Sequence, residues 1–269
     1  MFEQIKLIVS DIDGTLIPYG ERTLPEALFP AIRALREAGI LFCPASGRQY
    51  HALYRLFAPV GEEIGYLCEN GAVVMGPGPE GQAQMLSKTT MPRETAIALC
   101  CEIMELPGCL TLVSGAEAGY VLGRDNPLLE MMAAEEGSRM RSVERFEEID
   151  EILKVSVYAP DGVALPSERL GPRYGGMFRM AEAGPAWLDF TVADKGKGLR
   201  GLCAALGVDL AETLAFGDNW NDVPMLDLVG MPYLMSTAAP QLRARYPRQC
   251  SDVMDVIGEI LEERKSRRL

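Results

Sequence analysis

The sequence predicts an α/β protein in which a doubly wound, mainly parallel sheet is interrupted by an inserted α+β segment. Short apolar runs alternate with helical patterns over roughly the first eighty residues, and the same alternation returns near the C-terminus. Between these parts, helices and strands no longer alternate, which favours an antiparallel sheet. We therefore expect residues 1–82 and 186–269 to form one core, and residues 83–185 to form a separate domain.

The N-terminal part is expected to begin with strands separated by helices. Three short apolar runs are predicted to be buried strands: residues 5–9, 40–43 and 66–68. Leu28, Ile32 and Leu35 recur at helical spacing between the first two runs, and Gly39 is placed to end that helix. The dipeptide 70–71, Asn-Gly, then predicts a hairpin with the apolar residues that follow it.

The middle of the chain predicts an α+β segment with a sheet of its own. Strands are expected at residues 110–113, 120–122, 153–158 and 177–180. Helices are expected at residues 93–106 and 127–136. Turn-rich breaks at residues 76–81 and 182–185 are the expected boundaries with the core.

The alternating pattern returns after the second break. Strands are expected over residues 187–190 and 214–216, with a helix between them that ends at Gly207. A last helix is expected over about residues 253–264, with acidic residues early and basic residues late, as the helix dipole favours. Together with the N-terminal part, these elements predict one parallel sheet covered by helices on both faces.

The composition excludes several kinds of partner and site. The net charge of −12 repels nucleic acid and anionic membranes, so neither is an expected partner. It also means that an anionic substrate needs a local positive site. The chain has a single histidine, His51, which we expect on the surface; one histidine cannot form a histidine-rich metal site.

The sequence also indicates a cellular compartment. Its seven cysteines show no zinc-binding or disulfide pattern. No apolar stretch is long enough to span a bilayer, and the residues before the first strand do not resemble a signal peptide. We therefore expect a cytoplasmic protein with reduced thiols.

Two acidic residues, Asp11 and Asp13, directly follow the first predicted strand. In open α/β sheets, ligands bind at the carboxyl ends of the strands. A buried, unpaired carboxylate is costly, so two of them at this place indicate a bound positive group, most simply a hard divalent cation. The structural alternative is that one residue caps a helix and the other lies in a turn.

Further polar residues follow the other predicted strands. They are Thr15, the segment Ser46, Gly47 and Arg48, the loop residue Lys195, and the set Asp218, Asn221 and Asp222. Parallel strands end at one edge of a sheet, so we expect these groups to converge. Crowded carboxylates cannot all ionise without cations, which Mg²⁺ and a lysine would supply. Hydroxyl and amide donors around a cation suit phosphate, and with no histidine expected there, Asp11 or Asp13 would be the nucleophile.

Four motifs occur in a fixed order: Asp-Ile-Asp-Gly-Thr-Leu at 11–16, Ser-Gly-Arg at 46–48, Lys-Gly at 195–196 and Gly-Asp-x-x-Asn-Asp at 217–222. In this order they resemble the haloacid dehalogenase (HAD) superfamily, and more closely its Cof-type sugar-phosphate phosphatases. The resemblance implies a Rossmann-like catalytic core, with the insert as a cap domain that selects the substrate. It also implies Mg²⁺-dependent hydrolysis of a small phosphorylated metabolite through an aspartyl-phosphate.

The resemblance implies a role for each site residue. Asp11 would be the nucleophile. Asp13 would protonate the leaving oxygen, then deprotonate the attacking water, and bind Mg²⁺ through its backbone carbonyl. The other metal residues would be Asp218 and Asp222, the latter as a ligand or a partner of a ligand. The phosphate and the substrate would be held by Ser46, Lys195 and Asn221, to which we add Thr15, Gly47 and Arg48.

Some alternatives stay open at this point. Lys197 is the alternative to Lys195 as the lysine of the third motif. A phosphomutase of the phosphomannomutase type is compatible with the several arginines of the insert. A non-catalytic binding protein on the same scaffold is a second alternative, which the intact acidic residues disfavour. The sequence does not distinguish sugar phosphates, flavin mononucleotide and pyridoxal phosphate as substrates.

Overall fold

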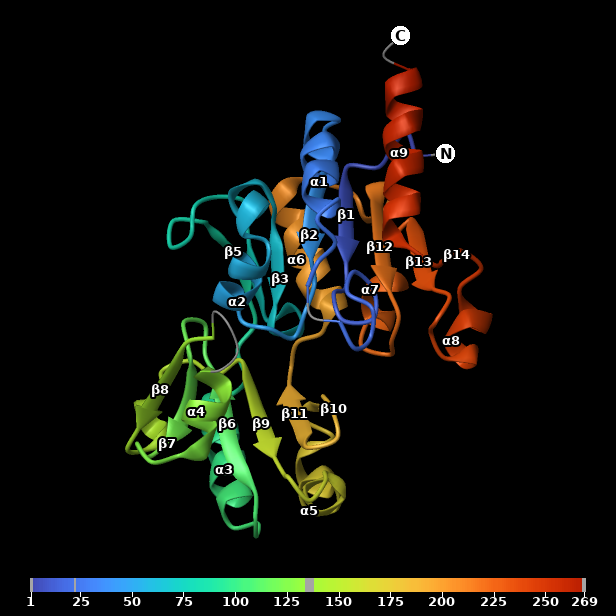
Figure 1. The fold of residues 1–269 in the computed structure, drawn as a ribbon. Coiled ribbons are helices and arrows are strands. Elements are labelled where there is room, and N and C mark those ends of the chain that lie inside the picture. The colour runs from blue at the N-terminus through green and yellow to red at the C-terminus, as the bar shows by residue number, and fades with distance from the viewer. Residues whose placement is uncertain (1, 22, 134–137, 268–269) are drawn as a thin grey trace. The chain divides into compact units, whose positions relative to one another are not determined.

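The computed structural model describes residues 2–21, 23–133 and 138–267 (Figure 1). The chain divides into two compact units, one formed by residues 1–88 and 194–269 and the other by residues 89–193. A parallel sheet in the first unit and a mostly antiparallel sheet in the second confirm the predicted fold class. Both unit boundaries lie a few residues further along the chain than we expected.

The first unit is built on a sheet with the strand order β14-β13-β12-β1-β2. Its strands are β1 (Leu7–Ser10), β2 (Leu41–Pro44), β12 (Thr213–Gly217), β13 (Met231–Met235) and β14 (Gln249–Cys250). Every neighbouring pair is parallel. Because β1 lies between β2 and β12, strands from distant parts of the chain end side by side (Figure 1).

Helices follow most of these strands. They are α1 (Leu28–Glu37), α2 (Tyr50–Leu56), α6 (Lys195–Leu206), α7 (Val223–Leu226), α8 (Pro240–Arg245) and α9 (Val253–Ser266), with short 3-10 turns at Ala58–Glu63, Glu69–Gly71 and Leu210–Glu212. Leu7 and Val9 of β1 are fully buried in one apolar cluster with Leu199 and Leu202 of α6. This packing joins the second half of the core to its first strand.

The first turn of helix α6 includes residues 195–198, which the sequence predicts to be a loop. The Asp194 side chain caps the helix by accepting a hydrogen bond of 2.8 Å from the Lys197 amide. The helix ends as predicted at Gly207, whose φ of 64° lies in the left-handed region. Lys195 is therefore the first helical residue and not part of a loop.

A small antiparallel sheet completes the first unit. It contains β3 (Tyr66–Cys68), β4 (Val73–Met75) and β5 (Met85–Lys88), and the predicted turn at residues 70–71 joins the first two. β4 pairs with β5, so the glycine- and proline-rich run 76–81 is the loop of a hairpin. Our expectation that this run marks the boundary between the units is therefore wrong, because the chain pairs back on β4 before it leaves the core.

The second unit has a sheet with the order β10-β11-β9-β6-β7-β8. Its strands are β6 (Leu110–Ser114), β7 (Gly119–Leu122), β8 (Met140–Val143), β9 (Lys154–Tyr158), β10 (Arg179–Glu182) and β11 (Trp187–Thr191). Among the described strands of this sheet, β7 and β8 alone pair in parallel. We expected residues 187–190 in the core, but β11 pairs antiparallel with β9 and belongs to the second unit.

Helices of the second unit are α3 (Arg93–Met104), α4 (Pro127–Ala133) and α5 (Ala164–Tyr174), with a 3-10 turn at Phe146–Glu148. Val155, Val157 and Phe190 of the sheet form a buried cluster with Leu99 of α3 and Leu170 of α5. The expected end of the helix near Glu136 lies outside the described residues. Within the described part of the chain, none of the helices is both long and apolar enough to span a membrane.

Candidate active site

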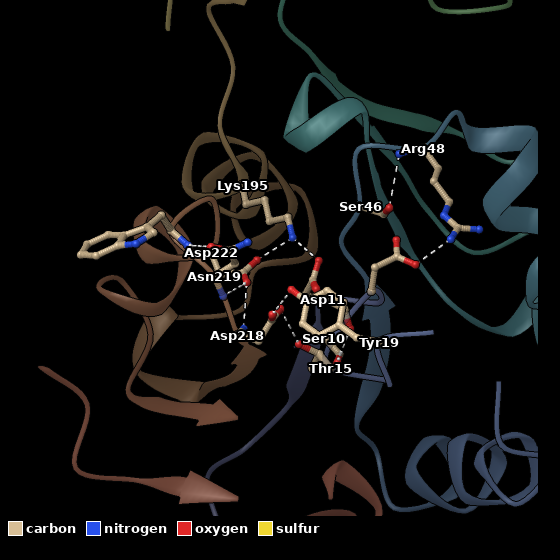
Figure 2. Close-up of polar contacts among 12 residues, drawn as sticks. Ser10, Asp11, Thr15, Tyr19, Ser46, Arg48, Lys195, Asp218, Asn219 and Asp222 are labelled. Carbon is tan, nitrogen blue, oxygen red and sulfur yellow. Dashed lines mark hydrogen bonds and ion pairs between the residues drawn. The ribbon is translucent and has the colours of Figure 1, made fainter. Parts of the chain in front are cut away.

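The strand order brings the first and last motifs together. β1 and β12 are parallel neighbours, with Ser10 opposite Phe216. The Asp11 amide donates a hydrogen bond of 3.0 Å to the Phe216 carbonyl, so Asp11 directly follows the paired part of β1. Asp218 follows the end of β12 in the same way. The two carboxylates therefore lie at one edge of the sheet, as the sequence predicts (Figure 2).

Three buried carboxylates form the centre of the site. Asp11, Asp218 and Asp222 each offer one oxygen atom, and these atoms lie within 4.8 Å of one another. The Asp222 Oδ2 atom accepts hydrogen bonds of 3.0 Å from the amides of Asp218 and Asn219, which fixes the turn after β12. A Cβ atom at Gly217 would lie 2.6 Å from the Asp222 Cβ, so this turn needs glycine.

One cation is placed among these acids. The Lys195 Nζ donates hydrogen bonds to Asp11 Oδ1 and to Asp222 Oδ1, the latter over 2.5 Å, and its side chain is fully buried. Its position in the first turn of α6 follows from the Asp194 cap described above. The side chain of Lys197 does not belong to this group, because Lys197 is exposed. The geometry thus favours Lys195 over Lys197 as the lysine of the third motif.

The electrostatics of the cluster show a shortage of positive charge. Burial raises the pKa of the Asp11 carboxyl well above its usual value, and the charge of Asp222 raises it further, whereas Lys195 opposes both effects. Burial also raises the pKa of Asp218. Burial by itself would lower the pKa of Lys195, but the Asp11 and Asp222 carboxylates outweigh it and raise that pKa. One ammonium thus contacts two of three clustered acids, and their oxygen atoms are the ligands that a hard divalent cation prefers.

Two hydroxyl groups bind Asp218. Thr15 Oγ1 donates to Asp218 Oδ1 over 3.2 Å, and Tyr19 OH donates to Asp218 Oδ2 over 2.6 Å. We expected Thr15 to hold phosphate, but its hydroxyl binds a carboxylate here. The sequence places Tyr19 near the site but does not predict its bond to Asp218, because Tyr19 lies in a turn outside the first motif.

Gly14 lies beneath this contact with a φ of 92°. A Cβ atom there would lie 2.5 Å from Asp218 Oδ2 and 2.6 Å from the ring of Tyr19. Such distances are too short for any side chain atom, so the glycine of the first motif allows both groups to approach the backbone.

The second motif lies at the end of β2. The Ser46 Oγ accepts a hydrogen bond of 3.3 Å from the Arg48 amide, and the Arg48 guanidinium lies 2.7 Å from Asp13 Oδ1. A Cβ atom at Gly47 would lie 3.1 Å from the Asn70 side chain. The motif is therefore tied to the first motif through the pair of Arg48 and Asp13.

Some predicted residues lie outside the buried cluster. The Asp13 side chain is 56% exposed and is not one of the three clustered carboxylates. Asn221 is also exposed. His51 differs from our expectation, because it is buried on α2 with Nδ1 2.9 Å from Glu80 Oε1. The Tyr50 ring lies 5.3 Å from the His51 ring, and Glu80 comes from a distant loop, so the sequence around His51 does not reveal its burial.

The family follows from a comparison with known proteins. The family model of haloacid dehalogenase-like hydrolases matches residues 8–255. The chain belongs to this family. The result confirms the resemblance drawn from the four motifs, and with it the prediction of a phosphatase that acts on phosphoric monoesters.

Several relatives extend over almost the whole chain. A 5-amino-6-(5-phospho-D-ribitylamino)uracil phosphatase of Escherichia coli strain K12 is 27% identical, covering 96% of this chain and 97% of its own. An HMP-PP phosphatase of Cronobacter sakazakii is 25% identical over 88% of this chain and 86% of its own. A crystal structure from Eubacterium rectale matches with a TM-score of 0.82 and 28% identity, covering 98% of this chain and 99% of its own.

Proposed function

We propose that this hydrolase removes phosphate from a small phosphorylated metabolite, with Mg²⁺ held at the three-carboxylate cluster and the phosphoryl group carried transiently on Asp11. The observation that supports the proposal most is the buried contact of Lys195 with both Asp11 and Asp222. An ammonium in this position neutralises part of the negative charge and leaves other carboxylate oxygens available to attack phosphorus or to bind a cation. A nucleophile, a cation and a metal-binding acid are thus within reach of one phosphate group.

Mg²⁺ would be held by the Asp11 and Asp218 carboxylates and by the Asp13 carbonyl, with Asp222 as a further ligand or a partner of one. When bound, it supplies positive charge to the phosphate oxygens and to Asp11, a role that phosphoryl transfer needs. Lys195 supplies charge from the protein itself. The closeness of the Asp11, Asp218 and Asp222 oxygen atoms supports this proposal.

The proposed chemistry has two steps. In the first, an Asp11 carboxylate oxygen attacks phosphorus, the bond from phosphorus to the leaving oxygen breaks, and Asp13 gives its proton to that oxygen. In the second, Asp13 removes a proton from water, which attacks phosphorus and releases inorganic phosphate from Asp11. Asp13 suits this exchange because its side chain is exposed and can reach solvent.

The residues of the second motif would position the phosphate. The Ser46 hydroxyl and the Gly47 amide are donors at the end of β2, and Arg48 carries a charge beside Asp13. Asn221 is a further donor at the end of the sheet, whereas the Thr15 hydroxyl donates to Asp218. Positioning by such groups and neutralisation of charge account for most of the catalysis of phosphoryl transfer.

The second unit, residues 89–193, is proposed to act as the cap that selects the substrate. The named substrates of the two relatives differ, one being a phosphorylated ribitylaminouracil and the other HMP-PP. We infer a sugar phosphate or a similar phosphorylated metabolite as the substrate class, without choosing a member of it.

A panel assay tests the proposal. Purified protein is given phosphorylated metabolites, and released phosphate is measured with Mg²⁺, with EDTA and after Asp11→Asn. We expect release that needs Mg²⁺ and is lost in the variant, and a phosphoryl group on Asp11 by mass spectrometry after acid quench. Activity only with an added sugar bisphosphate, and with isomerised product, would favour the mutase. A well-folded protein with no turnover on any compound would favour a binding protein.

A further inference from the structure

Tyr19 is an exposed residue whose hydroxyl reaches into the acidic cluster. The residue is 69% exposed, yet its OH lies 2.6 Å from Asp218 Oδ2. Figure 2 shows the Tyr19 hydroxyl directed at the Asp218 carboxylate. The partner of this hydroxyl, Asp218, is a proposed metal ligand.

The contact occupies Asp218 from both sides. Thr15 Oγ1 donates to Oδ1 and Tyr19 OH donates to Oδ2, and the shorter of the two bonds is the one from Tyr19. A hydroxyl bound to a carboxylate at this distance is a charge-assisted hydrogen bond. The Tyr19 hydroxyl is the donor of this bond and Asp218 Oδ2 is the acceptor. Each donor that binds the Asp218 carboxylate leaves fewer of its lone pairs free for a cation.

We propose that Tyr19 is this chain's own competitor for the metal, holding Asp218 while the cluster is free and leaving it when the cation binds. The inference rests on the metal site of the proposed function and adds a residue that the four motifs do not include. Tyr19 thereby lowers the affinity for the cation, because binding must first break its bond to Asp218.

The local structure allows Tyr19 to leave. It lies in a turn followed by Gly20, whose φ is 95° and around which a Cβ atom would meet no atom within 4 Å. Thr15, by contrast, is buried next to β1. Most of the Tyr19 side chain is exposed, so its displacement costs the hydrogen bond to Asp218 and the contact of the ring with Gly14.

The affinity for Mg²⁺ in the absence of substrate tests this inference. Metal-stripped wild type and Tyr19→Phe are titrated with MgCl₂ by calorimetry, and their unfolding midpoints are measured in EDTA. Phenylalanine keeps the ring and removes the hydroxyl, so we expect Mg²⁺ to bind about threefold to tenfold more tightly. We also expect a lower unfolding midpoint without metal, because the bond to Asp218 is lost.

Tyr174→Phe is the matched control. Tyr174 OH donates to Glu102 Oε1 over 2.9 Å in the second unit, and Glu102 is not part of the cluster. This variant should be less stable than wild type with an unchanged affinity for Mg²⁺.

Three results would overturn the inference. Equal or weaker binding of Mg²⁺ to Tyr19→Phe would show that Tyr19 supports Asp218 in the loaded protein. An unchanged midpoint without metal would show that the hydrogen bond contributes nothing. If neither wild type nor variant bound Mg²⁺, the proposed metal site would be wrong, and the inference with it. Binding to the variant alone would instead support the competition between Tyr19 and the cation.

Discussion

Lys195 Nζ lies 2.5 Å from Asp222 Oδ1, and neither side chain is exposed to solvent. Such a pair contributes little net stability, because both charges have lost their hydration. Removal of one partner is costly, however, since it leaves the other charge buried and uncompensated. Removal of Lys195 costs more than for an isolated pair, because Lys195 also donates a hydrogen bond to Asp11.

Lys195→Met is therefore expected to reduce both stability and activity. Without the ammonium, the buried acids repel one another, and we expect the free energy of unfolding at neutral pH to fall by about 3 kcal/mol. The loss of charge at the phosphate should lower kcat/KM at least about 100-fold. Urea unfolding and steady-state kinetics with Mg²⁺ measure the two effects. Lys197→Met is the control, since Lys197 is exposed, and a similar loss there would contradict the assignment.

Gly14→Ala tests the crowding beneath Asp218. Alanine at a φ of 92° is strained, and its Cβ would also lie 2.5 Å from Asp218 Oδ2. We expect a fall of kcat/KM of at least about 100-fold, because a misplacement of about 1 Å at the reacting groups is enough for such a loss. Gly20→Ala has a similar φ of 95° with open space around it, so it should cost stability but retain activity. Equal activities of the two variants would rule out the steric explanation.

Much of the site was predictable because its parts follow strands with clear apolar patterns. Once the run at residues 5–9 is taken as a buried strand, Asp11 must lie at a sheet edge, and the same reasoning places Asp218. The burial of Lys195 also agrees with the need of clustered acids for a cation. These inferences need only local sequence and the geometry of parallel sheets.

Other features depend on pairing between distant strands, which local sequence does not encode. Residues 187–190 have the apolar pattern of a strand in either unit, and only their pairing with β9 assigns them to the second. Helix α5 was missed because Pro172 lies inside it. The contact between Tyr19 and Asp218 joins residues 199 positions apart. The cytoplasmic location stays a prediction.

Asp13→Asn should separate chemistry from folding. The Asp13 side chain is 56% exposed and its ion pair with Arg48 lies at the surface, so the free energy of unfolding should change by less than about 0.5 kcal/mol. The amide cannot exchange a proton with the leaving group or water, so kcat should fall by about 100-fold or more. Thermal unfolding and kinetics on one substrate check both values. A large loss of stability, or normal turnover, would contradict the role of Asp13 as the acid and base.

The raised pKa of Asp11 predicts how the stability of the metal-free protein depends on pH. A carboxyl with a higher pKa in the folded state binds its proton more tightly there, so its contribution to stability falls as pH rises from about 4, the unfolded value, through the folded pKa. Asp11→Asn lacks this titration. In EDTA, the free energy of unfolding of the variant minus that of wild type should therefore increase as the pH rises above about 4. Saturating Mg²⁺ should reverse the trend, because the cation favours the ionised carboxylate of the wild type. Parallel urea curves at each pH test both signs. If the stability difference between variant and wild type depended on neither pH nor Mg²⁺, the pKa of Asp11 would not be raised in the folded protein.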